Sequence, residues 1–210
     1  MTSSFQLQLK DLACSKGGRP LFADINLSLQ AGQWLHLKGP NGSGKTSLLR
    51  LIAGLTQADK GQIFWNQQEI SHKDSDFQQQ RLYFGHHNGL QESSTVLENL
   101  QYLCALNSQT ISAKKINTVL AELGLRASTH KMVRYLSQGQ KRRVAMARLW
   151  LTEAVLWVLD EPFVALDTAS IEQLIQKMQQ HLLNGGCMVL TSHQEVDLHQ
   201  PQAIVLEIGQ

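Results

Sequence analysis

Hydrophobic and polar residues alternate in two segments near the start of the chain, at residues 5–9 and 25–29. This alternation is typical of strands that bury one face and leave the other in water, and we expect the two segments to pair as an antiparallel layer. Residues 34–38 form a short strand that leads into a glycine-rich turn. Apolar residues at helical spacing follow the turn and stop near Gly54, so the predicted order is strand, glycine-rich turn and helix.

The middle of the chain changes from strand patterns to helical ones. Residues 63–65 and 81–84 are expected strands, whereas aliphatic side chains recur at helical spacing between about residues 91 and 134. We interpret this stretch as an inserted helical subdomain. Residues 154–159 form an uninterrupted apolar run, which is typical of a parallel strand buried on both faces. One more helix and strand complete a predicted α/β fold, at residues 170–183 and 187–190.

Length and composition are those of one domain with a sizeable core, since 42% of the 210 residues are apolar. We expect a single domain over residues 1–210, with a core of residues 1–88 and 150–210 and a helical subdomain of about 89–149. The formal net charge of +2 comes without a long run of one sign, so the sequence predicts no nucleic-acid partner.

The sequence also bears on the location of the protein. The three cysteines are odd in number and far apart, which fits a reducing compartment. No apolar run approaches the roughly 20 residues that cross a bilayer, and the N-terminus lacks the apolar segment of a secretory signal. We therefore expect a cytoplasmic protein that acts on a membrane only through other subunits.

The glycine-rich turn fits the pattern of a phosphate-binding loop, in which glycines let backbone N–H groups approach phosphate oxygens at the start of a helix. Lys45 is expected to reach the β- and γ-phosphates, and Thr46 to offer its hydroxyl to Mg²⁺. The predicted nucleotide-binding residues are Gly39, Pro40, Asn41, Gly42, Ser43, Gly44, Lys45, Thr46 and Ser47.

Two acids, Asp160 and Glu161, end the buried apolar strand. Successive side chains of a strand point in opposite directions, so the two carboxylates are expected to differ in role. We predict that Asp160 holds Mg²⁺ through water and that Glu161 faces the γ-phosphate as a general base or as the group that orients the attacking water.

A second expected phosphate contact lies at residues 136–140. Ser137 and Gln140 have the spacing of a capping box that begins a helix. A helix N-terminus with a serine hydroxyl and a glycine amide also binds anions. Since the chain has a single phosphate-binding loop, we expect the phosphate at this second site to come from another copy of the chain.

With these motifs in this order, the sequence resembles the ABC ATPases over nearly its whole length. The resemblance implies a P-loop NTPase core with an antiparallel β layer and an inserted helical subdomain, and ATP with Mg²⁺ held between two head-to-tail copies. It assigns the Walker A lysine to Lys45, and the Walker B aspartate and catalytic glutamate to Asp160 and Glu161. It also implies that Asp167 lies in the D-loop and that His193 is the catalytic switch histidine. The signature motif that acts on the partner's nucleotide would comprise Ser137, Gln138, Gly139 and Gln140.

Two positions depart from the family pattern. The aromatic residue that stacks on adenine in many members would fall near Lys16, where there is no Tyr, Trp or Phe, so we expect weaker or less adenine-specific base recognition. The sensor glutamine that follows the strand ending near Phe84 is replaced by His86. We assign the sensor role to His86, whose charge can change near neutral pH, unlike that of an amide.

Within this family, segments 85–86, 141–151 and 157–163 resemble the ATPase subunits of the bacterial haem exporter used in cytochrome c maturation. That resemblance implies integral membrane permease subunits, an indirect link to a periplasmic haem chaperone, and a peripheral location at the cytoplasmic face of the inner membrane. We expect the exposed apolar residues of 91–107 to contact the membrane partner. Two alternatives stay open, namely the ATPase of a lipid or peptide exporter and a soluble ABC protein that binds ribosomes or DNA.

Overall fold

The computed structural model describes residues 6–70, 74–107, 109–198 and 203–209. Phe5, the predicted first residue of the first strand, lies outside these ranges. The chain divides into two compact units. The first consists of Met1–Phe84, Ala154–Pro162 and Met178–Gln210, and the second of Gly85–Glu153 and Phe163–Lys177. The second unit thus begins slightly before the predicted helical subdomain and also includes a later segment.

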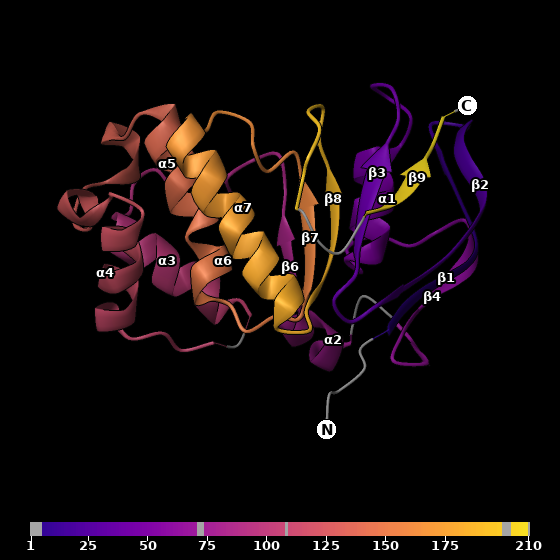
Figure 1. The fold of residues 1–210 in the computed structure, drawn as a ribbon, viewed down its shortest axis with the longest axis horizontal. Coiled ribbons are helices and arrows are strands. Elements are labelled where there is room, and N and C mark those ends of the chain that lie inside the picture. Colours follow the sequence, from indigo (N-terminus) through magenta and orange to yellow (C-terminus); the bar gives the residue numbers. More distant parts are fainter. Residues whose placement is uncertain (1–5, 71–73, 108, 199–202, 210) are drawn as a thin grey trace. The chain divides into compact units, whose positions relative to one another are not determined.

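An antiparallel sheet of four strands in the order β2-β1-β4-β5 forms one layer of the first unit (Figure 1). In this sheet Leu9 lies opposite both Leu27 and Ile63, so apolar side chains gather on one face. The predicted antiparallel pairing of the first two strands is therefore confirmed, although both strands are longer than the alternation indicated. The strands are β1 Gln6–Lys16, β2 Arg19–Gln30, β4 Lys60–Trp65 and β5 Gln68–Glu69.

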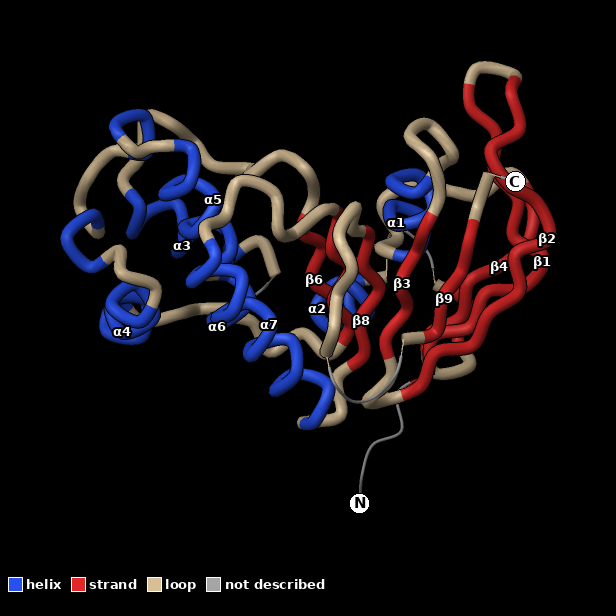
Figure 2. Tube along the Cα trace, turned by 45° about the horizontal axis from the view of Figure 1, so that its top comes forward, coloured by secondary structure: helices blue, strands red, loops and turns tan. Residues whose placement is uncertain are grey.

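A second, parallel sheet of five strands lies in the same unit, in the order β6-β7-β8-β3-β9, and Figure 2 shows the strands of both sheets in red. Every residue of β7 and β8 is buried, as expected of central parallel strands. The carboxyl ends of parallel strands share one edge of the sheet, where ligands bind in open α/β folds. The strands are β3 Trp34–Lys38, β6 Arg81–Phe84, β7 Leu156–Asp160, β8 Cys187–Thr191 and β9 Ile204–Glu207.

Helix α1, Lys45–Ile52, follows β3 and packs its apolar face on the core of the first unit. Gly44 precedes it with φ 102° and Gly54 follows it with φ 64°, so glycines with left-handed backbone conformations bound the helix. The expected order of strand, glycine-rich turn and helix is confirmed.

The second unit is helical. It contains α3 Val96–Ala105, α4 Ala113–Glu122, α5 Gln138–Met146, α6 Arg148–Leu151 and two short 3₁₀ turns, Arg126–Ser128 and Val133–Tyr135. Helix α7, Thr168–Leu183, begins in this unit and ends in the first. Gly124 ends α4 with φ 68°, at the position where the apolar periodicity stops. These helices confirm the predicted α/β fold with an inserted helical segment.

Several short elements were not expected from the sequence, among them α2 Ser75–Gln80, β5 and β9. Helix α2 begins at Asp74, whose side chain accepts hydrogen bonds from the amides of Asp76 and Phe77. Phe77 is the one buried residue of this helix and packs at an angle of 58° against Trp65. Because only one of the six residues of α2 is apolar, the sequence shows no helical periodicity there, and the helix could not be predicted.

Candidate nucleotide-binding site

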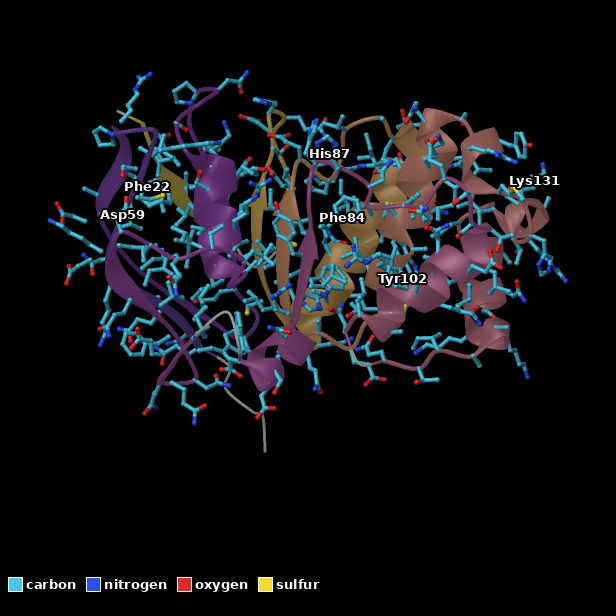
Figure 3. All side chains as sticks on the ribbon, turned by 180° about the vertical axis from the view of Figure 1, so that it is seen from behind. Phe22, Asp59, Phe84, His87, Tyr102 and Lys131 are labelled. Carbon is cyan, nitrogen blue, oxygen red and sulfur yellow. The ribbon has the colours of Figure 1, made fainter. Side chains whose placement is uncertain are left out.

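The predicted phosphate loop joins β3 to α1 at the carboxyl edge of the parallel sheet. Its backbone needs glycine, since a β-carbon at Gly39 would lie 2.3 Å from the carbonyl oxygen of Ile208. At Gly44 a β-carbon would lie 3.1 Å from the ring of Phe22, a residue that Figure 3 labels on the first unit. The loop is therefore closely packed on its inner side.

Lys45 extends over the loop that precedes it. Its ammonium group donates hydrogen bonds to the carbonyl oxygens of Gly39, at 2.7 Å, and Pro40, at 3.1 Å. Asn41 and Gly42 are exposed, Ser43 is buried, and Ser47 is half-buried in the first turn of α1. The predicted nucleotide-binding residues thus form one continuous segment, the loop of residues 39–44 and the first turn of α1, with the Lys45 ammonium bonded to carbonyl oxygens of the loop.

Asp160 ends β7 and is only 3% exposed. One carboxylate oxygen, Oδ2, accepts a hydrogen bond of 2.9 Å from the hydroxyl of Thr46 at the start of α1. The other, Oδ1, accepts one of 2.9 Å from the hydroxyl of Thr191 at the end of β8. The carboxylate therefore joins the phosphate loop to two neighbouring strands of the sheet.

Glu161, the next residue, has φ 50°, a left-handed conformation that is uncommon outside glycine and often occurs at active sites. Its amide donates to the hydroxyl of Thr191 at 3.0 Å, which fixes the turn. One of its carboxylate oxygens, Oε1, lies 3.5 Å from Nε2 of His193, and the amide of His193 donates to the other oxygen at 3.3 Å. The structure thus brings together Glu161 and the exposed His193 beside the loop that carries Lys45.

The signature residues lie in the second unit, at the start of α5. The predicted capping box is confirmed: the hydroxyl of Ser137 accepts from the amide of Gln140 at 3.2 Å, and the Gln140 side chain accepts from the amide of Ser137 at 3.0 Å. The first amides of a helix have no partner within it, and here they belong to Gln138 and Gly139. Ser137 is exposed, so its hydroxyl hydrogen and these amides can all reach an anion outside the unit.

Asp167, the predicted D-loop residue, lies in the same unit immediately before α7. Its side chain accepts a hydrogen bond of 2.9 Å from the amide of Ser170. Hydrogen bonds from the hydroxyl and amide of Ser170 lower the pKa of the Asp167 carboxyl, so the exposed side chain is held in its charged form.

His86, the predicted sensor, lies just after β6 at the beginning of the second unit. It is exposed, and its ring lies edge-on to the ring of His87, with centroids 5.6 Å apart. Figure 3 labels His87. Lys16 stands near the position where many family members have an aromatic residue that stacks on adenine. It ends β1 and pairs with Arg19 across the β1-β2 hairpin.

Sequence reasoning missed Thr191, the residue that contacts both acids. It is fully buried, donates to Asp160 and accepts from Glu161. A hydroxyl residue directly after the apolar run of 187–190 was the available signal. Its role depends on the parallel pairing that places Asp160 opposite Thr191, and strand order is not visible in a local motif.

Comparison with known proteins identifies the family. The family model described as "ABC transporter" matches residues 22–164, more than half of the chain. The chain belongs to the ABC transporter family. This ATP-binding ABC ATPase has the mixed antiparallel and parallel α/β fold of the family. Among the described residues, the helices are all too short or too polar to cross a lipid bilayer.

Several relatives carry the name "Cytochrome c biogenesis ATP-binding export protein CcmA". This chain is 48% identical to the protein of that name from Albidiferax ferrireducens, over 96% of each protein. It is 40% identical to the Pasteurella multocida protein, over 99% of this chain and 97% of the relative. The Escherichia coli K12 protein is also 40% identical, over 91% of each.

Solved structures agree on the fold. An ATP-binding protein of an ABC transporter from Pyrococcus furiosus superposes with a TM-score of 0.81 over 97% of each chain, at 24% identity. A dimeric ATP-binding cassette in a post-hydrolysis state, bound to ADP and Pi, superposes with a TM-score of 0.78 over 90% of this chain and 88% of the other, at 22% identity.

Proposed function

We propose that this chain hydrolyses ATP as one half of a head-to-tail dimer and thereby drives a membrane complex of bacterial cytochrome c biogenesis. The observation that carries the catalytic part is the convergence of Thr46, Asp160 and Thr191 at one carboxylate, with Glu161 and His193 in contact beside it. These groups come from three separate segments of the sequence, at residues 46, 160–161 and 191–193, and meet beside the phosphate loop.

Each group in this cluster has a distinct part in the reaction. The amides of the loop and Lys45 bind the phosphates, and Lys45 exchanges its carbonyl partners, Gly39 and Pro40, for phosphate oxygens. Glu161 orients the water that attacks the γ-phosphorus and takes up its proton, while His193 holds the Glu161 carboxylate and the γ-phosphate in place. The bond from the γ-phosphorus to the bridging oxygen breaks, and ADP leaves with that oxygen.

The Thr46 hydroxyl and the Asp160 carboxylate form an oxygen donor set that suits Mg²⁺, because this ion prefers hard oxygen ligands and keeps several waters. We propose that these two residues hold the ion, Thr46 directly and Asp160 through water. When bound, Mg²⁺ neutralises charge on the β- and γ-phosphate oxygens.

The proposed dimer is supported by a second candidate anion site in the chain. Ser137, Gln138 and Gly139 offer a hydroxyl and a helix N-terminus to an anion, and the one phosphate-binding loop of the chain lies in the other unit. A second copy in head-to-tail orientation supplies the phosphate, so that each ATP contacts the phosphate loop of one chain and the signature residues of its partner. Asp167 lies at the proposed interface.

The biological role rests on the names of the relatives. Proteins 40 to 48% identical over nearly the whole chain are named as ATP-binding export proteins of cytochrome c biogenesis. We therefore propose integral membrane permease subunits as partners, an indirect effect on a periplasmic haem chaperone, and a peripheral location at the cytoplasmic face of the inner membrane. We propose Tyr102 of helix α3 and Leu106, the residue directly after this helix, as contacts for a permease, since each is 62% exposed; Figure 3 labels Tyr102.

The dimer is tested with Glu161→Gln, which keeps the size of the side chain but removes its charge. We expect this variant to bind ATP, to lose hydrolysis and to accumulate as an ATP-bound dimer in size-exclusion chromatography with light scattering. Ser137→Arg is the matched control, because it should leave nucleotide binding to the single chain intact and stop hydrolysis. A Glu161→Gln protein that stays monomeric under saturating ATP would refute the dimer.

The partners are tested by purifying the tagged chain from detergent-solubilised membranes of its host and identifying the proteins that accompany it by mass spectrometry. Membrane subunits together with a haem-carrying periplasmic protein would support the role in cytochrome c biogenesis. Recovery of permeases for another substrate would contradict it, and ribosomal proteins alone would contradict the membrane role as a whole.

A further inference from the structure

Arg142 is a buried cation on the helix that begins with the signature residues. It lies in α5, five residues after Ser137, and is only 3% exposed. Its Nη1 nitrogen donates to the side-chain oxygen of Asn88 at 3.1 Å and, over a longer 3.4 Å each, to the carbonyl oxygens of Gly85 and His86. Because one nitrogen carries two hydrogens, the three acceptors share them. The guanidinium therefore lies in a turn of oxygens made by residues 85–88, which we call the sensor loop.

A second contact joins the same two elements slightly further along the chain. Lys141, the neighbour of Arg142, forms an ion pair of 2.6 Å with Glu92. The Glu92 side chain is 66% exposed, so solvent screens this pair and it contributes little to stability. Its geometric effect is to hold the segment after the sensor loop close to the start of α5.

The remainder of this segment is fixed to α3 by a buried amide. Asn99, 2% exposed, accepts from the amide of Gln91 at 2.7 Å and donates to the carbonyl oxygens of Gln91 and Thr95 at 3.0 and 2.9 Å. The segment after the sensor loop is thus tied to α3 through Gln91 and to α5 through Glu92. Movement of the sensor loop without movement of α5 would remove acceptors from a buried cation, which is strongly unfavourable.

We propose that Arg142 is a positioning residue that joins the sensor loop to the signature helix, so that His86 and Ser137 move as one body. A displacement of the sensor loop, caused by nucleotide or by a membrane partner, is then transmitted directly to the residues that contact the phosphate of the second copy. The role in catalysis rests on the proposed function of His86 and Ser137, whereas the physical coupling of the loop and the helix does not.

The coupling is tested by hydrogen exchange of the purified chain with Arg142→Gln, which removes the charge and shortens the reach. We expect amides of residues 85–92 to exchange on the order of tenfold faster, with the amides of α4 unchanged. Arg126→Gln is the matched control, because Arg126 is an exposed arginine in the same unit and outside the proposed machinery. If Arg142→Gln does not fold, Asn88→Ala keeps the arginine, removes the shortest of its three acceptors and is expected to speed exchange in the same segment.

The catalytic consequence is tested by ATP hydrolysis in the complex isolated with the tagged chain. We expect Arg142→Gln to lower kcat about tenfold or more with little change in KM, and Arg142→Lys to recover part of the loss. In combination with His86→Ala, the loss in kcat should be smaller than the product of the two single losses, since both act through one loop.

The outcomes separate this inference from the proposed function. Unchanged exchange at residues 85–92 in both Arg142→Gln and Asn88→Ala would overturn the coupling, whatever the activity of the complex. Faster exchange with independent, multiplicative effects on kcat would overturn the transmission to catalysis. A wild-type complex without ATPase activity would contradict the proposed function and leave the exchange result as it stands.

Discussion

Gly186 is a glycine whose missing side chain makes room for an aromatic ring of the first unit. It lies in the turn between α7 and β8, and a β-carbon there would lie 2.3 Å from two atoms of the His181 ring. That ring is stacked on Trp157, with centroids 3.8 Å apart and planes inclined by 10°. Trp157 is only 2% exposed and belongs to β7, the strand that ends in Asp160. The substitution Gly186→Ala therefore pushes against a ring that has a fixed neighbour on its face.

The magnitude follows from the contacts that the ring would lose. To reach an ordinary separation from the new methyl group the His181 ring must retreat by about 1 Å. This displacement disturbs the stack on Trp157, worth about 0.5–1.5 kcal/mol. It also disturbs the contact of 3.3 Å between Nε2 and the carbonyl oxygen of Cys187, worth a further 0.5–1.5 kcal/mol or so. Alanine also lowers the conformational entropy of the unfolded chain relative to glycine, which stabilises the folded protein by about 0.4–1 kcal/mol. The expected net destabilisation is about 1–2 kcal/mol.

The assay is thermal unfolding of four proteins: wild type, Gly186→Ala, His181→Ala and the double variant. We expect Gly186→Ala to lower Tm by about 2–8 °C in the wild-type background, because about 1 kcal/mol shifts Tm by roughly 2–4 °C in a chain of this size. With His181 already replaced by alanine, the same substitution should leave Tm unchanged or raise it. An equal loss in both backgrounds would show that the ring is not the cause.

Gly185 supplies the control for backbone effects. Its φ is +85° and no atom lies within 4 Å of a β-carbon built there, so Gly185→Ala is unfavourable for its backbone conformation alone. We expect a loss of about 1 kcal/mol that is the same with and without His181. A comparison of Gly185→Ala with Gly186→Ala thus distinguishes backbone strain from a steric clash within one turn.

Three further predictions concern single buried groups. Burial lowers the pKa of His36, so at pH below about 6.5 the unfolded chain binds more protons than the folded one and the free energy of unfolding falls. His36→Gln should weaken this pH dependence in urea titrations at pH 5.5 and 7.5. An unchanged pH dependence would show that His36 is not its source. Burial raises the pKa of Cys187 to about 12, so Ellman's reagent at pH 8 should modify Cys187 only after unfolding. Cys14 is partly exposed and should react first. A rapidly reacting thiol in the folded Cys14→Ser variant would refute this order. Thr191→Val keeps the shape of the side chain but removes its hydrogen bonds to Asp160 and Glu161. We expect the free energy of unfolding in chemical denaturation to fall by about 1–3 kcal/mol and ATP hydrolysis to slow. Unchanged hydrolysis would argue against a role of Thr191 in positioning the two carboxylates.

The sequence predicted the larger elements because their hydrophobic periodicity is local. Residues 34–38 and 81–84 form strands with the expected bounds, and the helix expected at 170–183 begins two residues earlier, as α7. Strand β9 was missed for a physical reason. Its four residues alternate between half-buried and exposed at the sheet edge, so its existence depends on pairing with β3 rather than on an apolar run of its own.

The candidate site divides in the same way. Lys45, Glu161 and Ser137 belong to continuous motifs, and motif spacing is visible in a single sequence. Thr191 is linked to Asp160 by strand pairing across 31 positions of sequence. Such contacts need the order of strands in the sheet, which no local pattern specifies.

Arg142 is a residue whose structural role the sequence does not reveal. It stands between Lys141 and Arg143 in a basic run that was interpreted only as a family marker. On a helix, positions three and four residues apart share a face, so Arg142 lies on the same side as Ala145 and Met146, which are both buried. A cation on the apolar face of a helix requires oxygen acceptors, and backbone carbonyls of a neighbouring loop can supply them. The helical period does not single out Arg142, however, because residues 144–147 are all apolar and buried and give Lys141 and Arg143 the same pattern. The acceptor loop of residues 85–88 lies about 55 positions earlier in the sequence, so only the fold shows which of the three basic side chains it binds.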